Sequence, residues 1–129
     1  MSKAYSITSK DAPAAIGPYS QAVVAGDIMF VSGQIPIVPA TGEVTERGII
    51  AQATQVFENI GAILREAGKD FSDVVKTTVL LADIGDFATV NGIYAKYFTS
   101  DPLPARAAYQ VAALPKAVMI EVEVVVYMG

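Results

Sequence analysis

The amino-acid sequence predicts an α+β fold, in which a mixed β-sheet carries two helices packed on one face. Its 129 residues are enough for one ordinary domain. Segments with a period of two residues, typical of strands, alternate with two segments of 3.6-residue periodicity, typical of helices. The sequence contains no internal repeat or linker that would mark a second domain. We therefore expect a single domain over residues 1–129.

The first half of the chain is predicted to form a hairpin and then a long helix. Apolar runs at 22–24 and 28–31 flank a Gly-Asp pair at 26–27, which suits a tight type II′ turn. A proline-containing loop follows over 36–42. Apolar residues at helical spacing then predict a helix ending near Gly68, with the buried side formed by Ile49, Ala53, Val56, Phe57, Ile60, Ile63, Leu64 and Ala67.

The second half is predicted to run strand, helix, strand, strand. β-Branched and apolar residues over 74–81 indicate a buried strand. After a turn at 83–86, one side of a second helix carries Phe87, Val90, Ile93, Tyr94 and Tyr97. Prolines at 102 and 104 favour an extended entry to a strand at 105–111. In the last segment, 118–127, alternate residues share one face of a strand, namely Ile120, Val122, Val124 and Val126.

The composition indicates self-association. The chain is 53% hydrophobic, with a mean hydropathy of +0.44, which excludes disorder. Its 17% of charged residues is well below the roughly 25% of a typical soluble domain. No apolar run approaches the ~18 residues that a membrane span needs, so we assign the surplus hydrophobicity to a subunit interface and expect a homo-oligomer. The N-terminal segment lacks the features of a secretory or transit signal, so a cytoplasmic protein is expected.

The missing residue types limit the chemistry. The chain has no Cys and no His, which excludes a thiolate nucleophile, a Ser-His-Asp triad and nearly every zinc site. Carboxylates, Arg, Lys, Tyr, Ser and backbone groups remain to carry any chemistry, and no carboxylate cluster has the spacing of a metal-binding loop. A net charge of −4 and nine scattered Lys and Arg residues give little basis for binding nucleic acid.

Two kinds of charged residue are candidates for catalysis. Arg106 lies between small residues on a strand otherwise fit for burial, and a partly buried guanidinium needs an anion. That anion is either a carboxylate of the protein itself or a ligand. Glu121 and Glu123 share one face of the last strand with apolar neighbours, where a carboxyl group has a raised pKa and can act as general acid or base. The alternative is that both are solvated surface carboxylates.

Four further residues are weaker candidates. Ser32 and Gly33 end a strand, and Gly33 would let a ligand approach the backbone N–H groups, although a simple strand-end turn explains the same pattern. Tyr19 follows a stiff Gly-Pro turn and Asn91 lies on the second helix; packing and ordinary surface exposure are the plain explanations of these two.

Several motifs, in order along the chain, resemble the RidA/YjgF family of reactive intermediate deaminases. The match runs from about residue 12 to residue 126, and many ordered motifs are far more specific than one. The motifs are Ile16-Gly17-Pro18-Tyr19-Ser20-Gln21-Ala22, Val31-Ser32-Gly33-Gln34-Ile35-Pro36, Asp86-Phe87-Ala88-Thr89-Val90-Asn91, Pro104-Ala105-Arg106, Leu114-Pro115-Lys116 and Ile120-Glu121.

The resemblance implies a chorismate-mutase-like fold, a homotrimer with clefts between subunits, and cofactor-free hydrolysis of 2-iminobutanoate and 2-iminopropanoate to 2-oxo acids and ammonia. It implies that Arg106 binds the substrate carboxylate and that Glu121 activates water. Tyr19, Ser32, Gly33 and Asn91 would line the cleft. Family members often carry Cys at the position of Ala108, so only a role for its backbone carbonyl carries over.

Two other functions fit the same residues. The Arg106 cleft could bind a small 2-oxo acid without catalysis. A ribonuclease or translation inhibitor, an activity found among family members, would have to bind phosphates with an acidic chain that lacks His.

Overall fold

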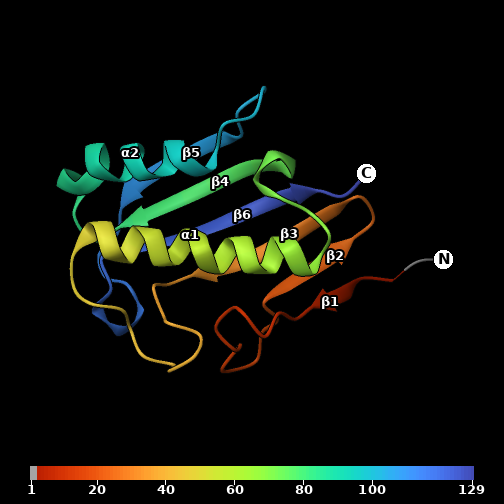
Figure 1. Ribbon diagram of the computed structural model, residues 1–129, viewed down its shortest axis with the longest axis horizontal. Coiled ribbons are helices and arrows are strands. Elements are labelled where there is room, and N and C mark those ends of the chain that lie inside the picture. The colour runs from red at the N-terminus through yellow and green to blue at the C-terminus, as the bar shows by residue number, and fades with distance from the viewer. Residues whose placement is uncertain (1–2) are drawn as a thin grey trace.

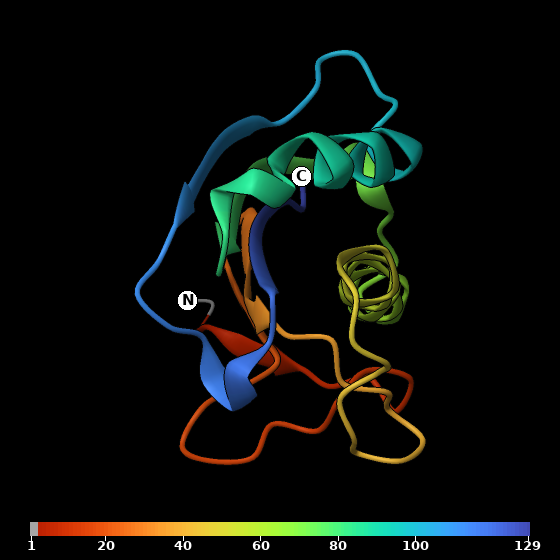
Figure 2. The ribbon, with the colours of Figure 1, turned by 90° about the vertical axis from the view of Figure 1, so that its left-hand side faces the viewer.

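The computed structural model describes residues 3–129 and consists of a six-stranded sheet with two helices on one face (Figures 1 and 2). The strands are β1 (Tyr5–Ile7), β2 (Ala22–Ala25), β3 (Ile28–Gln34), β4 (Val74–Leu81), β5 (Ala105–Gln110) and β6 (Ile120–Tyr127). The helices are α1 (Ile49–Glu66) and α2 (Phe87–Tyr97). Strand order is β1-β2-β3-β6-β4-β5; β4 and β5 run parallel, and the other neighbours are antiparallel. The predicted mixed α+β fold is confirmed.

The predicted elements form close to their expected bounds. Ala25 pairs with Ile28 across a two-residue turn in which Gly26 has a φ of 60°. Helix α1 ends as predicted, because Gly68 takes a φ of 73° and the N–H of Lys69 donates to the carbonyl of Leu64 at 2.8 Å. Strand β1 was not predicted, since its three residues are mostly exposed and show no alternation.

The core lies between the helices and one face of the sheet. All four alternate residues of β6 predicted to share a face are buried there, as is the apolar side of α1. Two buried amides of α1 hold neighbouring loops. The Gln52 side chain accepts from the N–H of Met119 at 2.8 Å, and Asn59 donates to the carbonyl of Ile37 at 2.9 Å. These bonds fix the chain just before β6 and just after β3.

The other face of the sheet carries no helix, and we call it the open face (Figure 2). Strand register and alternation place on it Phe30, Lys76, Thr78, Leu80, Tyr109, Glu121, Glu123, Val125 and Tyr127. Phe30, Tyr109 and Tyr127 are 53%, 51% and 50% exposed. Three large side chains so exposed on one face of a sheet point to an interaction surface. Within residues 3–129, neither helix is long and apolar enough to cross a membrane.

Candidate active site

Arg106 lies on β5, at the edge of the sheet, with its side chain on the helix-bearing face. Its register partner on β4 is the buried Thr77. The expectation that Arg106 is partly buried was wrong: the residue is exposed, because β5 has a neighbour on one side only. Its Nη1 donates to Oδ1 of Asn91 at 2.7 Å. This partner is a neutral amide, so the bond orients the guanidinium without neutralising its charge.

Helix α2 supplies the surroundings of the guanidinium. Phe87, Asn91 and Tyr94 are spaced four and three residues apart, so they share one face of the helix. The guanidinium carbon of Arg106 lies 4.9 Å from the ring centre of Tyr94 and 5.2 Å from that of Phe87. A pocket of about 340 Å³ adjoins it, lined by Asn91, Tyr94, Ala95, Phe98, Leu103, Pro104 and Arg106. Sequence reasoning placed both aromatic residues in the core and missed this contact, although their spacing from Asn91 signals it.

Glu121 lies on the open face and is half-buried. Burial, and secondarily the negative charge of Glu123, raise the pKa of the Glu121 carboxyl group. The carboxyl group packs directly over Gly33 of β3. A Cβ atom at Gly33 would lie 2.9 Å from the carboxyl carbon of Glu121 and still closer to one of its oxygens. Gly33 therefore leaves room for the Glu121 carboxyl group in this position, and a larger residue there would displace that group.

Ser32 connects β3 to the loop that carries Tyr19. Its Oγ donates to the carbonyl of Ser20 at 2.6 Å, and its N–H donates to the carbonyl of Gln21 at 2.9 Å. The register between β3 and β6 shifts between Val31 and Gln34, so Ser32 and Gly33 lie outside the regular ladder. Tyr19 itself is exposed. Ser32 thus holds the backbone next to Tyr19. Gly33 lies where the pairing of β3 with β6 is irregular.

The predicted site residues fall into two groups on opposite faces of the sheet. Asn91, Arg106 and Ala108 form what we call the Arg106 half-site; Ala108 is two residues from Arg106 and points to the same face. Tyr19, Ser32, Gly33 and Glu121 form the Glu121 half-site. Glu121 stands in register with Leu80 and Tyr109, two strands and three residues from Arg106, which corresponds to roughly 14 Å between Cα atoms. One chain therefore does not bring Arg106 and Glu121 into one cavity.

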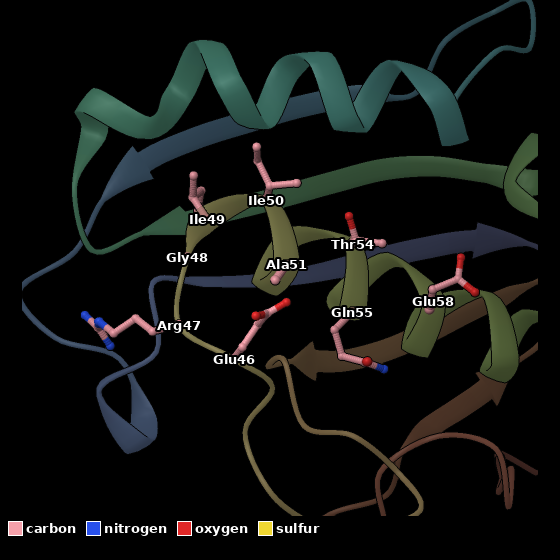
Figure 3. Close-up of a pocket in the computed structure, with 9 residues that line it drawn as sticks. All are labelled: Glu46, Arg47, Gly48, Ile49, Ile50, Ala51, Thr54, Gln55 and Glu58. Carbon is pink, nitrogen blue, oxygen red and sulfur yellow. The ribbon is translucent and has the colours of Figure 1, made fainter.

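A separate pocket of about 560 Å³ lies at the start of α1 and contains none of the predicted site residues (Figure 3). Two of its charged side chains are bonded to groups outside it. Arg47 donates to the carbonyl of Ala117 at 3.1 Å, and Glu58 accepts from the hydroxyl of Tyr97 at 2.9 Å. Among residues 3–129, no three acidic side chains are grouped so that they could hold a metal ion.

Comparisons with known proteins identify the family. Residues 9–128 match the family model described as endoribonuclease L-PSP. A human 2-iminobutanoate/2-iminopropanoate deaminase is 55% identical, over 95% of this chain and 89% of its own. Solved relatives include a Rid family protein from Yersinia pestis, with TM-score 0.94 and 45% identity over 97% and 99% of the two chains. Another is TdcF of E. coli with bound serine, with TM-score 0.90 and 41% identity over 97% and 99%. The chain therefore belongs to the endoribonuclease L-PSP family, the RidA/YjgF family of reactive intermediate deaminases that its motifs resemble.

Proposed function

We propose that this protein hydrolyses small 2-imino acids, such as 2-iminopropanoate and 2-iminobutanoate, to 2-oxo acids and ammonia. The observation that carries the proposal is the environment of Arg106. Its guanidinium is exposed and held by an amide oxygen and two aromatic rings, so its charge stays available to a ligand. A planar fork of N–H donors matches a carboxylate. The deaminase names of the relatives and the serine bound to TdcF both point to small molecules with a carboxylate.

We place the complete site between two copies of the chain. Arg106 and Glu121 lie on opposite faces of one sheet, so a site that uses both needs the Arg106 half-site of one copy and the Glu121 half-site of another. The exposed apolar side chains of the open face supply a surface for such association. A closed ring built from one repeated contact fits this arrangement, since each copy would offer both half-sites. Among such assemblies we propose a homotrimer, which is the state that the family resemblance implies.

In the proposed reaction, the substrate reacts as its iminium form, which is already a strong electrophile. Arg106 binds its carboxylate with two parallel hydrogen bonds and leaves C2 open to water. Glu121 accepts a proton from the water as its oxygen bonds to C2, giving a carbinolamine. The carboxylic acid of Glu121 then returns the proton to the amine nitrogen. As the C–N bond breaks and ammonia leaves, the Glu121 carboxylate takes the proton of the hydroxyl group, whose oxygen becomes the 2-oxo group.

The surroundings of Glu121 fit that role. An acid and base that takes a proton in one step and returns it in the next works best with a pKa nearer neutrality than that of an ordinary carboxyl group. Burial and the charge of Glu123 shift the pKa of Glu121 in that direction. General acid–base help of this kind contributes ~10²–10⁴-fold to the rate.

The experiment generates 2-aminoacrylate and 2-aminocrotonate with a serine/threonine dehydratase and measures release of the 2-oxo acids. We expect wild type to accelerate release and Arg106→Ala to lose most of that effect. If neither protein accelerates release but wild type binds 2-oxobutanoate, the chain is a binding module. If binding of RNA falls steeply with salt and cleavage co-purifies with the chain, the ribonuclease alternative replaces the proposal.

The oligomeric part is tested separately. Light scattering after gel filtration should give a defined oligomer for wild type. Replacing Phe30, on the open face, by Asp should yield monomers, because a charge would be buried in an apolar contact. Monomeric wild type at micromolar concentration would contradict a site between copies.

A further inference from the structure

We propose that Tyr94 is a positioning residue for Arg106, and that a buried hydrogen bond to Thr77 fixes Tyr94 in turn. The inference rests on the proposed function, in which Arg106 binds a carboxylate. Arginine has a long flexible side chain, and Arg106 stands on an exposed edge strand. Holding it with a carboxylate would orient it but would also compete with the substrate. Neutral groups avoid that competition.

Tyr94 is rigidly placed. Its hydroxyl lies 2.9 Å from Oγ1 of Thr77, which is fully buried in the sheet. Its ring packs at 4.3 Å from the ring centre of Phe98 and edge-on to Phe57 at 5.9 Å. Tyr94 is itself only 8% exposed, so it has little room to move. These contacts join the ring to β4, to α1 and to the end of α2.

The strand register places Thr77 next to Arg106. Thr77 on β4 and Arg106 on β5 are direct partners in the parallel pair, and their side chains lie on the same face. Tyr94 spans them from above: its hydroxyl reaches Thr77, and its ring lies 4.9 Å from the guanidinium carbon of Arg106. The sheet therefore fixes the position of the Tyr94 ring through Thr77, and the ring restricts the orientation of the Arg106 guanidinium. Asn91, one turn earlier on α2, accepts a hydrogen bond from Nη1 of Arg106 and restricts the guanidinium further.

Burial raises the pKa of the Tyr94 hydroxyl, against smaller opposing effects of the bond to Thr77 and the charge of Arg106. The phenol therefore remains neutral at physiological pH. Tyr94 supports Arg106 through the negative face of its ring rather than through a phenolate charge.

The test uses graded variants with a matched control. Tyr94→Leu removes the ring, Tyr94→Phe keeps it, and Thr77→Val removes the buried partner of its hydroxyl. Tyr97 is the control, since it belongs to the same aromatic cluster and donates to Glu58, and no contact joins it to Arg106. Tyr97→Leu should lower the melting temperature as Tyr94→Leu does.

Two readouts separate positioning from general stability. The first is binding of 2-oxobutanoate and steady-state kinetics at a temperature where all variants are folded. We expect Tyr94→Leu to raise Kd and KM about 3- to 10-fold with a much smaller change in kcat, and Tyr97→Leu to change neither. Tyr94→Phe should restore most of the affinity, and Thr77→Val should match Tyr94→Phe.

The second readout does not depend on activity. The chain has three arginines, so the side-chain N–H region of an NMR spectrum contains three Nε signals, and Arg106→Lys identifies one of them. Removal of a ring beside the guanidinium should shift that signal in Tyr94→Leu and leave it in place in Tyr97→Leu. If Tyr94→Leu does not fold, Thr77→Val and Tyr94→Phe should still displace the signal by a smaller amount.

The outcomes distinguish this inference from the proposed function. If Arg106→Ala weakens 2-oxobutanoate binding but Tyr94→Leu weakens it no more than Tyr97→Leu, Tyr94 does not position Arg106. The same conclusion follows if the Arg106 signal is unchanged in every Tyr94 and Thr77 variant. If Arg106→Ala binds 2-oxobutanoate as wild type does, the carboxylate role of Arg106 fails, whatever the NMR signal shows.

Discussion

The two half-sites of this protein are built in opposite ways. Arg106 is an exposed charge held by neutral groups, an amide and two aromatic rings, on the helix-bearing face. Glu121 is a half-buried carboxyl group pressed against a glycine on the open face, where burial raises its pKa. The first arrangement keeps a charge available to a ligand. The second disfavours a charge and so favours exchange of a proton.

This difference gives a reason why the group that binds the carboxylate and the group that exchanges protons lie on opposite faces of the sheet. An exposed arginine next to a half-buried acid would form an ion pair, which would lower the pKa of the acid and occupy the arginine. On opposite faces of one chain the two groups do not pair with each other, and in the proposed site between copies the substrate carboxylate occupies Arg106. A substitution in one half-site should therefore leave the other half-site intact.

The largest effect is expected for Glu121→Gln. Loss of the group that exchanges protons should lower kcat about 10²–10⁴-fold, while 2-oxobutanoate still binds. The folded protein should stay at least as stable as wild type at neutral pH. A raised pKa means that the Glu121 carboxyl group favours folding below its unfolded-state pKa and loses that contribution as pH rises through its folded-state value, and Gln avoids this loss. Unchanged turnover would show that another group activates water.

Arg106→Ala should come next. Loss of a charge-assisted contact of about 1.5–3 kcal/mol corresponds to a fall of roughly 10- to 150-fold in kcat/KM. The matched variant Arg65→Ala removes another exposed arginine, near the end of α1, and should leave the kinetics unchanged. Equal effects of the two substitutions would indicate a general effect of charge instead of a binding contact.

Gly33→Ala tests the close packing in the Glu121 half-site. The added methyl group would push the Glu121 carboxyl group, which is the far end of a flexible side chain, out of its position, so we expect a marked fall in kcat with little change in the free energy of unfolding. Gly92→Ala on α2 is the control, because a Cβ there meets nothing within 4 Å. That helical substitution should stabilise the protein by about 0.5–1 kcal/mol in denaturant titrations.

The smallest effect is expected for Glu123→Gln. Removing this negative charge should lower the pKa of Glu121 without changing its burial, which is the larger cause of the shift. If Glu121 acts in its ionised form, the acid limb of the kcat/KM profile should move to lower pH in Glu123→Gln. The nearby cation on this face is Lys76, which is retained in the variant. An acid limb that moves to higher pH would contradict the assignment of that limb to Glu121.

Much of the fold could be predicted because periodicity is a local property of the sequence. The helix α1, the hairpin of β2 and β3, and the alternation along β6 all appear at their predicted places, since each buries a regular row of apolar residues. β1 could not be predicted from three mostly exposed residues. β1 forms because it pairs with β2, and a local sequence pattern does not show such pairing with another segment.

The site could be predicted only in part, for a physical reason. Residue types and motifs single out Arg106 and Glu121, but the exposure of Arg106 depends on strand order. Its apolar strand would be buried in the middle of a sheet, and it is exposed because β5 stands at the edge. Likewise, alternation shows which residues of one strand share a face, but the relation of Arg106 to Glu121 depends on the pairing of β4 with both strands.

The measurement that tests the central claim most directly is complementation between two variants of low activity. Chains carrying Arg106→Ala and chains carrying Glu121→Gln would be co-expressed with different tags, and mixed oligomers isolated. If each site takes Arg106 from one copy and Glu121 from another, every mixed trimer contains one intact site out of three, so the isolated mixed trimers should show about a third of the wild-type activity. If mixed oligomers form and stay as inactive as either parent, both residues act within one chain or not at all, and a site between copies is contradicted.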